Sequence, residues 1–163
     1  MKILKFLAIF SFGGLSYGLC ELMFRGFTHI SMFVVGGLLF YLTGLLDEGK
    51  SPPCLIVQMA LGCLIITSGE LLSGTVINLF MGLEVWDYSL LPMNLLGQIC
   101  PQFSLIWLAL TLPVIYLDDL LRHFLFSQPL KRQRLLPGRK EALNLPETGS
   151  IILSEGDYPV AEG

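Results

Sequence analysis

Polar side chains that could bind a cation, exchange a proton or hydrogen-bond a solute gather in one stretch of an otherwise apolar chain, Ser68 to Trp107. Carboxylates, amides and one phenol are all present there: Glu70, Asn78, Glu84, Asp87, Tyr88, Asn94 and Gln98. Such groups cost several kcal/mol inside or beside hydrocarbon unless they are paired. A membrane protein that carries them is expected to use them, so this stretch is our candidate functional region.

A second polar group lies near the end of the first apolar segment. Glu21 and Arg25 are four residues apart, so they share one face of a helix and can form an ion pair. The pair could fix the depth of the helix in the membrane or form half of a polar site. His29 follows, and it is either an interfacial hydrogen-bonding group or a proton relay, because imidazole titrates near neutral pH.

The two carboxylates Glu21 and Glu70 are expected at equal depth. Counted from Lys5 and Cys54, the expected starts of their helices, both lie roughly 24 Å along the helix axis. Equal depth would allow them to share one polar cluster.

The composition determines the class of protein. The chain has 163 residues, of which 53% are hydrophobic and 14% are charged, and its mean hydropathy is +0.69. Ordinary soluble domains carry roughly 25% charged residues, so an integral membrane protein is predicted and a soluble enzyme is excluded. Six of the ten basic residues lie at or beyond Arg122. This basic run indicates either an anchor on anionic lipid or only a topology signal, and nucleic-acid binding is not expected.

Four apolar segments are long enough to cross a hydrocarbon core about 30 Å thick, so the expected fold is an all-α polytopic membrane protein. They run approximately over residues 3–24, 30–46, 54–83 and 103–121. The third is longer than one span requires, so it must tilt, protrude or break, and the weakest point is expected at Ser68–Gly69.

Residues 84–102 are too polar and too interrupted to cross the membrane. They form either an interfacial loop or a re-entrant segment between Pro92 and Pro101. We favour the re-entrant interpretation because Asn94 and Gln98 are one helical turn apart and both are polar.

The basic residues also predict the orientation and the domains. Lys2, Lys5 and the basic tail favour the cytoplasm, so both termini are expected there, which requires an even number of spans. Residues 1–126 then form a transmembrane domain, and residues 127–163 form a basic, then mixed-charge tail that is expected to be largely disordered. Residues 145–149 match a sortase sorting signal, but no apolar span follows, so we interpret the match as coincidence or an engineered tag.

Several chemistries are not expected. The cysteines form no C-x-x-C pair or metal-ligand spacing, so no metal site is predicted, and no cofactor is predicted either. No phosphate-binding G-x-x-x-x-G-K-[ST] motif occurs, so the chain itself is not expected to hydrolyse ATP in that way. No nucleophile elbow or zinc-protease motif is present, which argues against an enzyme.

Two motifs carry a family resemblance. One is Glu-Leu-Met-Phe-Arg-Gly-Phe at residues 21–27; the other is Trp-Asp-Tyr-Ser at 86–89, followed by Pro-Met-Asn-Leu-Leu-Gly-Gln at 92–98. With these motifs the chain resembles the CmpB-like family of type IV ABC-transporter permeases, small bacterial membrane proteins. The resemblance implies a plasma-membrane protein that moves a substrate with energy from a separate ATPase subunit. Four spans are few for a permease, so a homo-oligomer is expected, with glycine-rich faces on the first two helices allowing the contact.

Three functions follow in order of preference. The first is a transporter permease subunit that moves a small solute or ion. The second is a membrane binding or scaffold protein whose polar residues lock helices together, and the third is a membrane-embedded enzyme using His29 and the carboxylates as acid and base. The candidate residues for binding a substrate or ion are Glu21, Arg25, His29, Glu70, Asp87, Tyr88, Asn94 and Gln98.

Overall fold

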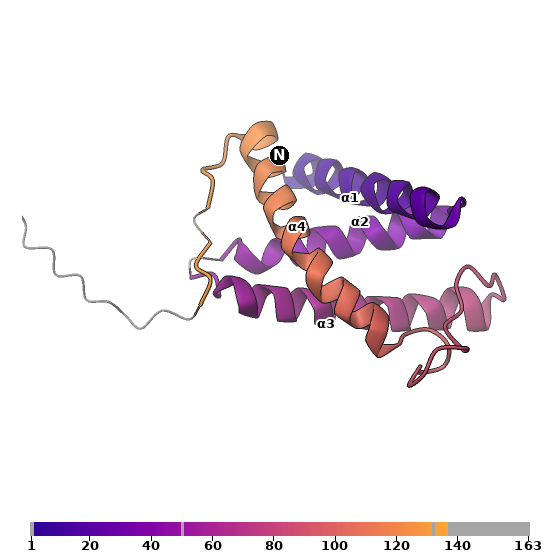
Figure 1. The fold of residues 1–163 in the computed structure, drawn as a ribbon. Helices are drawn as coiled ribbons and strands as arrows, with labels where there is room; N and C mark the ends of the chain where they lie inside the picture. Colours follow the sequence, from indigo (N-terminus) through magenta and orange to yellow (C-terminus); the bar gives the residue numbers. More distant parts are fainter. Residues whose placement is uncertain (1, 50, 132, 137–163) are drawn as a thin grey trace, which may run out of the picture.

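The computed structural model describes residues 2–49, 51–131 and 133–136, and within them the fold is all-helical, as predicted. Four helices are long and apolar enough to cross a membrane. In chain order the elements are α1 (Lys2–Arg25), α2 (Ile30–Gly44), the 3₁₀ turn η1 (Leu45–Asp47), α3 (Leu55–Gly74), the π-helical η2 (Thr75–Phe80) and α4 (Pro101–Phe126) (Figure 1). The sorting-signal match at residues 145–149 lies outside the described residues.

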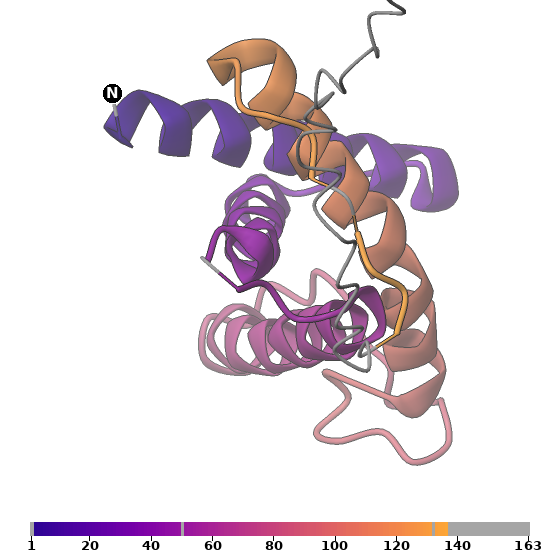
Figure 2. The same cartoon turned by 90° about the vertical axis from the view of Figure 1, so that its left-hand side faces the viewer.

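Successive helices run in opposite directions, so the molecule has two distinct ends (Figure 1). The start of α1, the end of α2, the start of α3 and the end of α4 lie at one end, which we call the tail-side end. The turn 26–29 and the loop 81–100 lie at the opposite, loop-side end. Helix α4 crosses the other three obliquely in both views (Figures 1 and 2). Its last residue, Phe126, receives the Lys5 ammonium at 5.1 Å from its ring centroid, which brings both ends of the helical domain together.

Helices α1 and α2 pack through glycines that face aromatic side chains of the opposite helix. A Cβ atom added at any of these glycines would overlap its partner, so the helices touch backbone to ring. The four pairs are Gly13 with Phe40, Gly14 with Phe33, Gly36 with Tyr17, and Gly37 with Phe10. The glycine-rich faces that we expected to serve an oligomer are therefore used inside the chain.

Helix α3 does not break at Ser68–Gly69, the weak point predicted from the sequence. It stays α-helical through Ser68–Gly69 to Gly74, and Gly69 packs directly against Leu39 of α2. The irregularity comes later, as the π-helical η2. Single π turns within helices occur often at functional positions.

The loop 81–100 contains no helix, so the expectation that Asn94 and Gln98 share a helical face is wrong. The chain instead turns sharply, with Glu84, Met93 and Leu96 in the left-handed backbone region. The loop folds back over η2, and its residues 85 and 86 are buried in an apolar cluster with residues 32 and 77. This packing holds the loop against α2 and η2 at the loop-side end.

Candidate functional site

The predicted ion pair at the end of α1 is confirmed, and it links α1 to the loop. The Glu21 carboxylate is buried and accepts hydrogen bonds from Arg25 Nη1 at 2.9 Å and from the Thr28 hydroxyl at 2.6 Å. The other guanidinium nitrogen of Arg25 donates to the Val85 carbonyl at 2.5 Å. Because each charge has its partner, this pair fixes the position of the loop over α1.

Glu70 stands in a different environment. Its side chain on α3 is only 4% exposed, and its carboxylate accepts a 2.7 Å hydrogen bond from Trp107 Nε1 of α4. The Trp107 ring in turn stacks on Tyr17 of α1 at 6.1 Å between centroids. In the described parts of the chain, no basic side chain forms an ion pair with Glu70. The carboxyl group is thus held inside a membrane-spanning helix by a neutral donor.

Tyr88 lies within electrostatic range of both carboxylates. Its ring stacks on Phe103 at 4.4 Å between centroids. Burial raises the pKa of the Tyr88 hydroxyl and the charge of Glu70 raises it further, while the Arg25 cation lowers it by more than the paired Glu21 carboxylate raises it. Both carboxylates therefore lie within electrostatic reach of one tyrosine. We call Glu21, Arg25, Glu70, Tyr88 and Trp107 the loop-side cluster.

The structure does not bring Asp87 and Asn94 into that cluster. Asp87 is exposed and accepts hydrogen bonds of 2.8 Å each from the backbone amide and the hydroxyl of Ser89, which lower its pKa. Asn94 donates to the Leu91 carbonyl at 2.8 Å and accepts from the Gly97 amide at 3.0 Å. Both side chains stabilise turns of the loop itself.

Gln98 and His29 are also occupied by local contacts. The side-chain carbonyl of the buried Gln98 accepts a 2.7 Å hydrogen bond from Asn78 of η2. The Asn78 side chain also hydrogen-bonds the backbone of residues 85 and 86. His29 caps the start of α2, where its Nδ1 accepts from the Ser31 amide at 3.2 Å. The Gln98 side chain joins the loop to η2, and His29 caps the N-terminus of α2.

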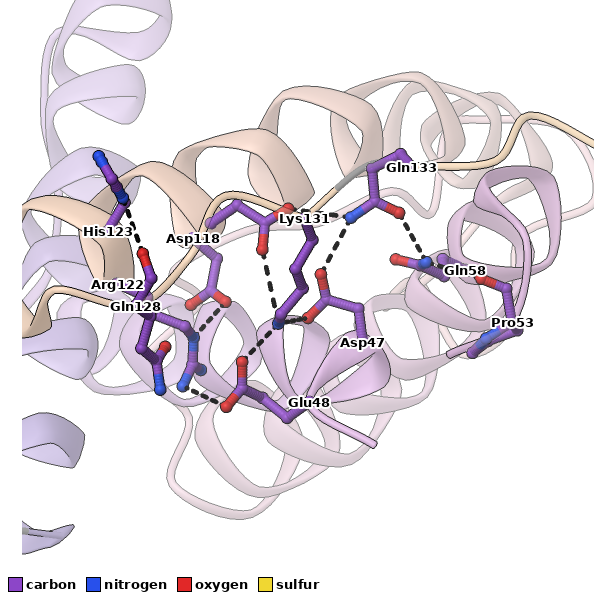
Figure 3. A network of polar contacts seen from close by, with 11 residues as sticks. Asp47, Glu48, Pro53, Gln58, Asp118, Arg122, His123, Gln128, Lys131 and Gln133 are labelled. Atoms are coloured by element: carbon purple, nitrogen blue, oxygen red, sulfur yellow. Dashed lines mark hydrogen bonds and ion pairs between the residues drawn. The ribbon is translucent and has the colours of Figure 1, made fainter. Parts of the chain in front are cut away.

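A second polar group, at the tail-side end, was not among the predicted site residues (Figure 3). Arg122 Nε donates to the Asp118 carboxylate at 2.6 Å, and its Nη1 lies 3.3 Å from Glu48. Asp118 is 1% exposed. We name this group the tail-side network; its charged members are Asp47, Glu48, Asp118, Asp119, Arg122 and Lys131.

Part of this network could be seen in the sequence and part could not. The spacing of Asp118 and Arg122 is that of an ion pair on one helix face. Lys131 and Asp47, in contrast, are 84 residues apart and meet only through the fold, at 2.8 Å. Burial alone would lower the pKa of Lys131, but its hydrogen bonds to Asp47 and Glu48 outweigh that effect and hold the pKa above its usual value.

Comparison with known families gives one match. The family model described as "Putative ABC-transporter type IV" matches residues 3–137. The chain belongs to this family. The match spans all four helices and both polar groups, and it supports the CmpB-like resemblance seen in the two sequence motifs. No curated protein and no solved structure gives a significant match.

For a member of an ABC-transporter family, the contrast between the two polar groups is informative. At the tail-side end, each of the four carboxylates lies within ion-pair distance of Arg122 or Lys131. At the loop-side end, Arg25 forms an ion pair with Glu21, while the only side-chain hydrogen-bond donor to the Glu70 carboxylate among the described residues is the neutral Trp107 indole. A buried carboxyl group balanced in this way can take up a proton or a cation with little rearrangement of its neighbours.

Proposed function

We propose that this chain is a transporter permease subunit that moves a small solute or ion across a bacterial plasma membrane. Its membership of an ABC-transporter family and its four apolar helices support the proposal. Because the sequence carries no phosphate-binding loop, a separate ATPase subunit would supply the energy. The basic residues Lys2, Lys5 and Lys131 lie at the tail-side end, which would therefore face the cytoplasm.

The observation that carries the proposal is Glu70. A carboxyl group within a membrane span is costly and is rarely found away from substrate, ion or proton pathways. Glu70 is buried, bound to Trp107, and within electrostatic reach of the same tyrosine as Glu21. In this role Glu70 would hold the transported cation, or a proton coupled to the transported solute, while Trp107 keeps its side chain in place.

The first experiment asks what the protein binds. The tagged full-length chain is isolated from native membranes in mild detergent, and its partners and native mass are determined. A stoichiometric ATPase partner supports the permease subunit. A homo-oligomer without an ATPase contradicts the ABC assignment and leaves a secondary transporter or channel to be tested by flux alone.

The second experiment tests the site in liposomes loaded with a pH-sensitive or cation-sensitive dye. Glu70→Gln keeps an acceptor for the Trp107 indole, so the protein should fold while flux falls to background. Glu84→Gln is the matched control, because Glu84 is exposed on the loop. Unchanged flux in Glu70→Gln, with wild-type folding, would reject the proposed role of Glu70.

A scaffold protein is the second candidate, and the loop contacts favour it. The polar groups of Asn78 and Gln98 hold the loop on η2, and those of Asn94 stabilise a turn within the loop. Such contacts contribute about 0.6 kcal/mol each in membrane bundles. If the chain is a scaffold, Glu70→Gln should reduce folding and partner binding together, with no flux in either protein.

A further inference from the structure

The chain turns back over the helix bundle directly after α4. Ser127 has a left-handed backbone (φ 53°), and the Gln128 amide then donates to the Arg122 carbonyl. The following residues pass across the tail-side ends of α2 and α3 (Figures 1 and 2). We call the described residues 127–131 and 133–136 the strap.

The strap inserts one ammonium group among three carboxylates. Lys131 Nζ lies 2.8 Å from Asp47 at the end of η1, 2.5 Å from Glu48, and 3.5 Å from Asp119 of α4 (Figure 3). Asp47 and Asp119 are both buried. One cation from the strap therefore lies between acidic groups that belong to two different helical elements.

Gln133 extends this connection to α3. Its side-chain amide nitrogen donates to Asp47 at 3.0 Å and to Asp119 at 2.9 Å. Its side-chain carbonyl accepts a hydrogen bond from the buried Gln58 of α3 at 2.9 Å. A single side chain thus joins the ends of α2, α3 and α4 (Figure 3). Movement of any one of these ends away from the others has to break its hydrogen bonds.

The strap also supplies the cap at the start of α3. The Leu55 amide donates to the Arg134 carbonyl at 2.7 Å, and the Ile56 amide donates to the Leu135 carbonyl at 3.5 Å. Amides in the first turn of an α-helix have no partner within the helix itself. Their hydrogen bonds to the strap are therefore a direct measure of whether the strap is in place.

Polar contacts alone hold the strap. Its three leucines, Leu130, Leu135 and Leu136, are all exposed, so no apolar side chain of the strap is anchored in the bundle. The contact between Lys131 and Glu48, two side chains that are each 27% exposed, weakens as the salt concentration rises, whereas the contacts of Lys131 with the buried Asp47 and Asp119 are screened much less. The strap is thus built to detach without disrupting the apolar core.

We propose that the strap is a detachable closure of the tail-side end, locked by Lys131 in its cage of Asp47, Glu48 and Asp119. While the lock is closed, the tail-side ends of α2, α3 and α4 stay together. Separation of these ends requires that the strap leave first. This inference does not depend on the proposed transport function, because it rests only on contacts at the tail-side end.

Hydrogen–deuterium exchange of the full-length protein in detergent tests the closure. Lys131→Gln should speed exchange at Leu55 and Ile56 about tenfold or more, since tenfold corresponds to about 1.4 kcal/mol and hydrogen bonds to charged groups contribute on that order. Wild-type protein in 1 M salt should show a smaller change in the same direction, because salt mainly weakens the partly exposed contact between Lys131 and Glu48. Lys2→Gln is the matched control, because Lys2 is an exposed lysine at the same end of the molecule.

An internal reference separates detachment from unfolding. The Tyr88 amide donates to the Gly97 carbonyl at 2.7 Å at the loop-side end, and its exchange should stay at the wild-type rate. Glu48→Gln removes one negative charge from the cage at a partly exposed position and should give a smaller acceleration at Leu55 and Ile56. Unchanged exchange there in both variants would overturn the proposal. Equal acceleration at Tyr88 would also overturn it, since Lys131 would then stabilise the whole fold.

Discussion

The buried ion pair of Asp118 and Arg122 provides the sharpest stability prediction. Arg122→Gln removes the cation 2.6 Å from a carboxylate that is 1% exposed, and it also removes a partner of Glu48. Breaking a buried pair from one side costs about 3–5 kcal/mol, because the remaining charge is left without compensation. An exposed pair would cost at most about 1 kcal/mol. The two cases are far enough apart to be distinguished.

The assay is the free energy of unfolding in mixed micelles, measured by titration with sodium dodecyl sulfate. Alongside Arg122→Gln, Asp118→Asn and the double variant complete a mutant cycle. The double variant should cost clearly less than the sum of the single variants, since it leaves no lone buried charge. Arg134→Gln is the matched control for loss of an exposed arginine at the same end, with an expected change within about 0.5 kcal/mol.

Two results would refute this reasoning. Arg122→Gln could cost no more than Arg134→Gln, or the effects of Asp118→Asn and Arg122→Gln could be additive. Either result would show that the two charges are solvated separately, so that the pair contributes no more than one on the surface.

Three further predictions concern helix packing, the loop and the loop tip. Gly37→Val should destabilise the protein by about 1–3 kcal/mol in the same micelle titration, because the added carbons meet Phe10 of α1, whereas Gly49→Ala should be neutral since space is open there. Asn78→Leu removes the partner of Gln98 and should cost about 1–3 kcal/mol, with faster proteolysis of residues 81–100 as the readout. Hydrogen bonds from Ser89 lower the pKa of the Asp87 carboxyl in the folded state, so NMR titration should place that pKa below 3.8. The contacts between Asp87 and Ser89 therefore stabilise the loop tip above pH 3.8 and are lost as the pH falls through the lowered pKa.

The sequence predicts what depends on composition and on short spacing. Hydropathy over long windows identifies the four spans, since each needs only enough apolar residues to cross the hydrocarbon. The spacing of Glu21 and Arg25 predicts their pair, because the regular geometry of one helix determines which residues meet. Glu70 is recognisable as a candidate because a carboxylate is rare in such surroundings.

The sequence does not predict contacts between segments that are far apart in the chain. Lys131 and Asp47 are 84 residues apart in the sequence, and no periodic pattern predicts their contact. The prediction for the loop failed for a different reason. Asn94 and Gln98 have helical spacing, but the chain between Pro92 and Pro101 is not helical, because Met93 and Leu96 adopt left-handed backbone conformations. The glycines of α1 and α2 were recognised as a close-packing surface, but their partners proved to be aromatic rings of the same chain.

The interlocked glycines and rings of α1 and α2 have a consequence for biogenesis. These two helices are joined by a turn of only a few residues, so little chain entropy is lost when they meet. The contact surface between them needs no residue of α3 or α4, because none takes part in those pairs. The first half of the protein can therefore enter the bilayer as a finished hairpin, and it then offers α3 and α4 a preformed template on which to assemble.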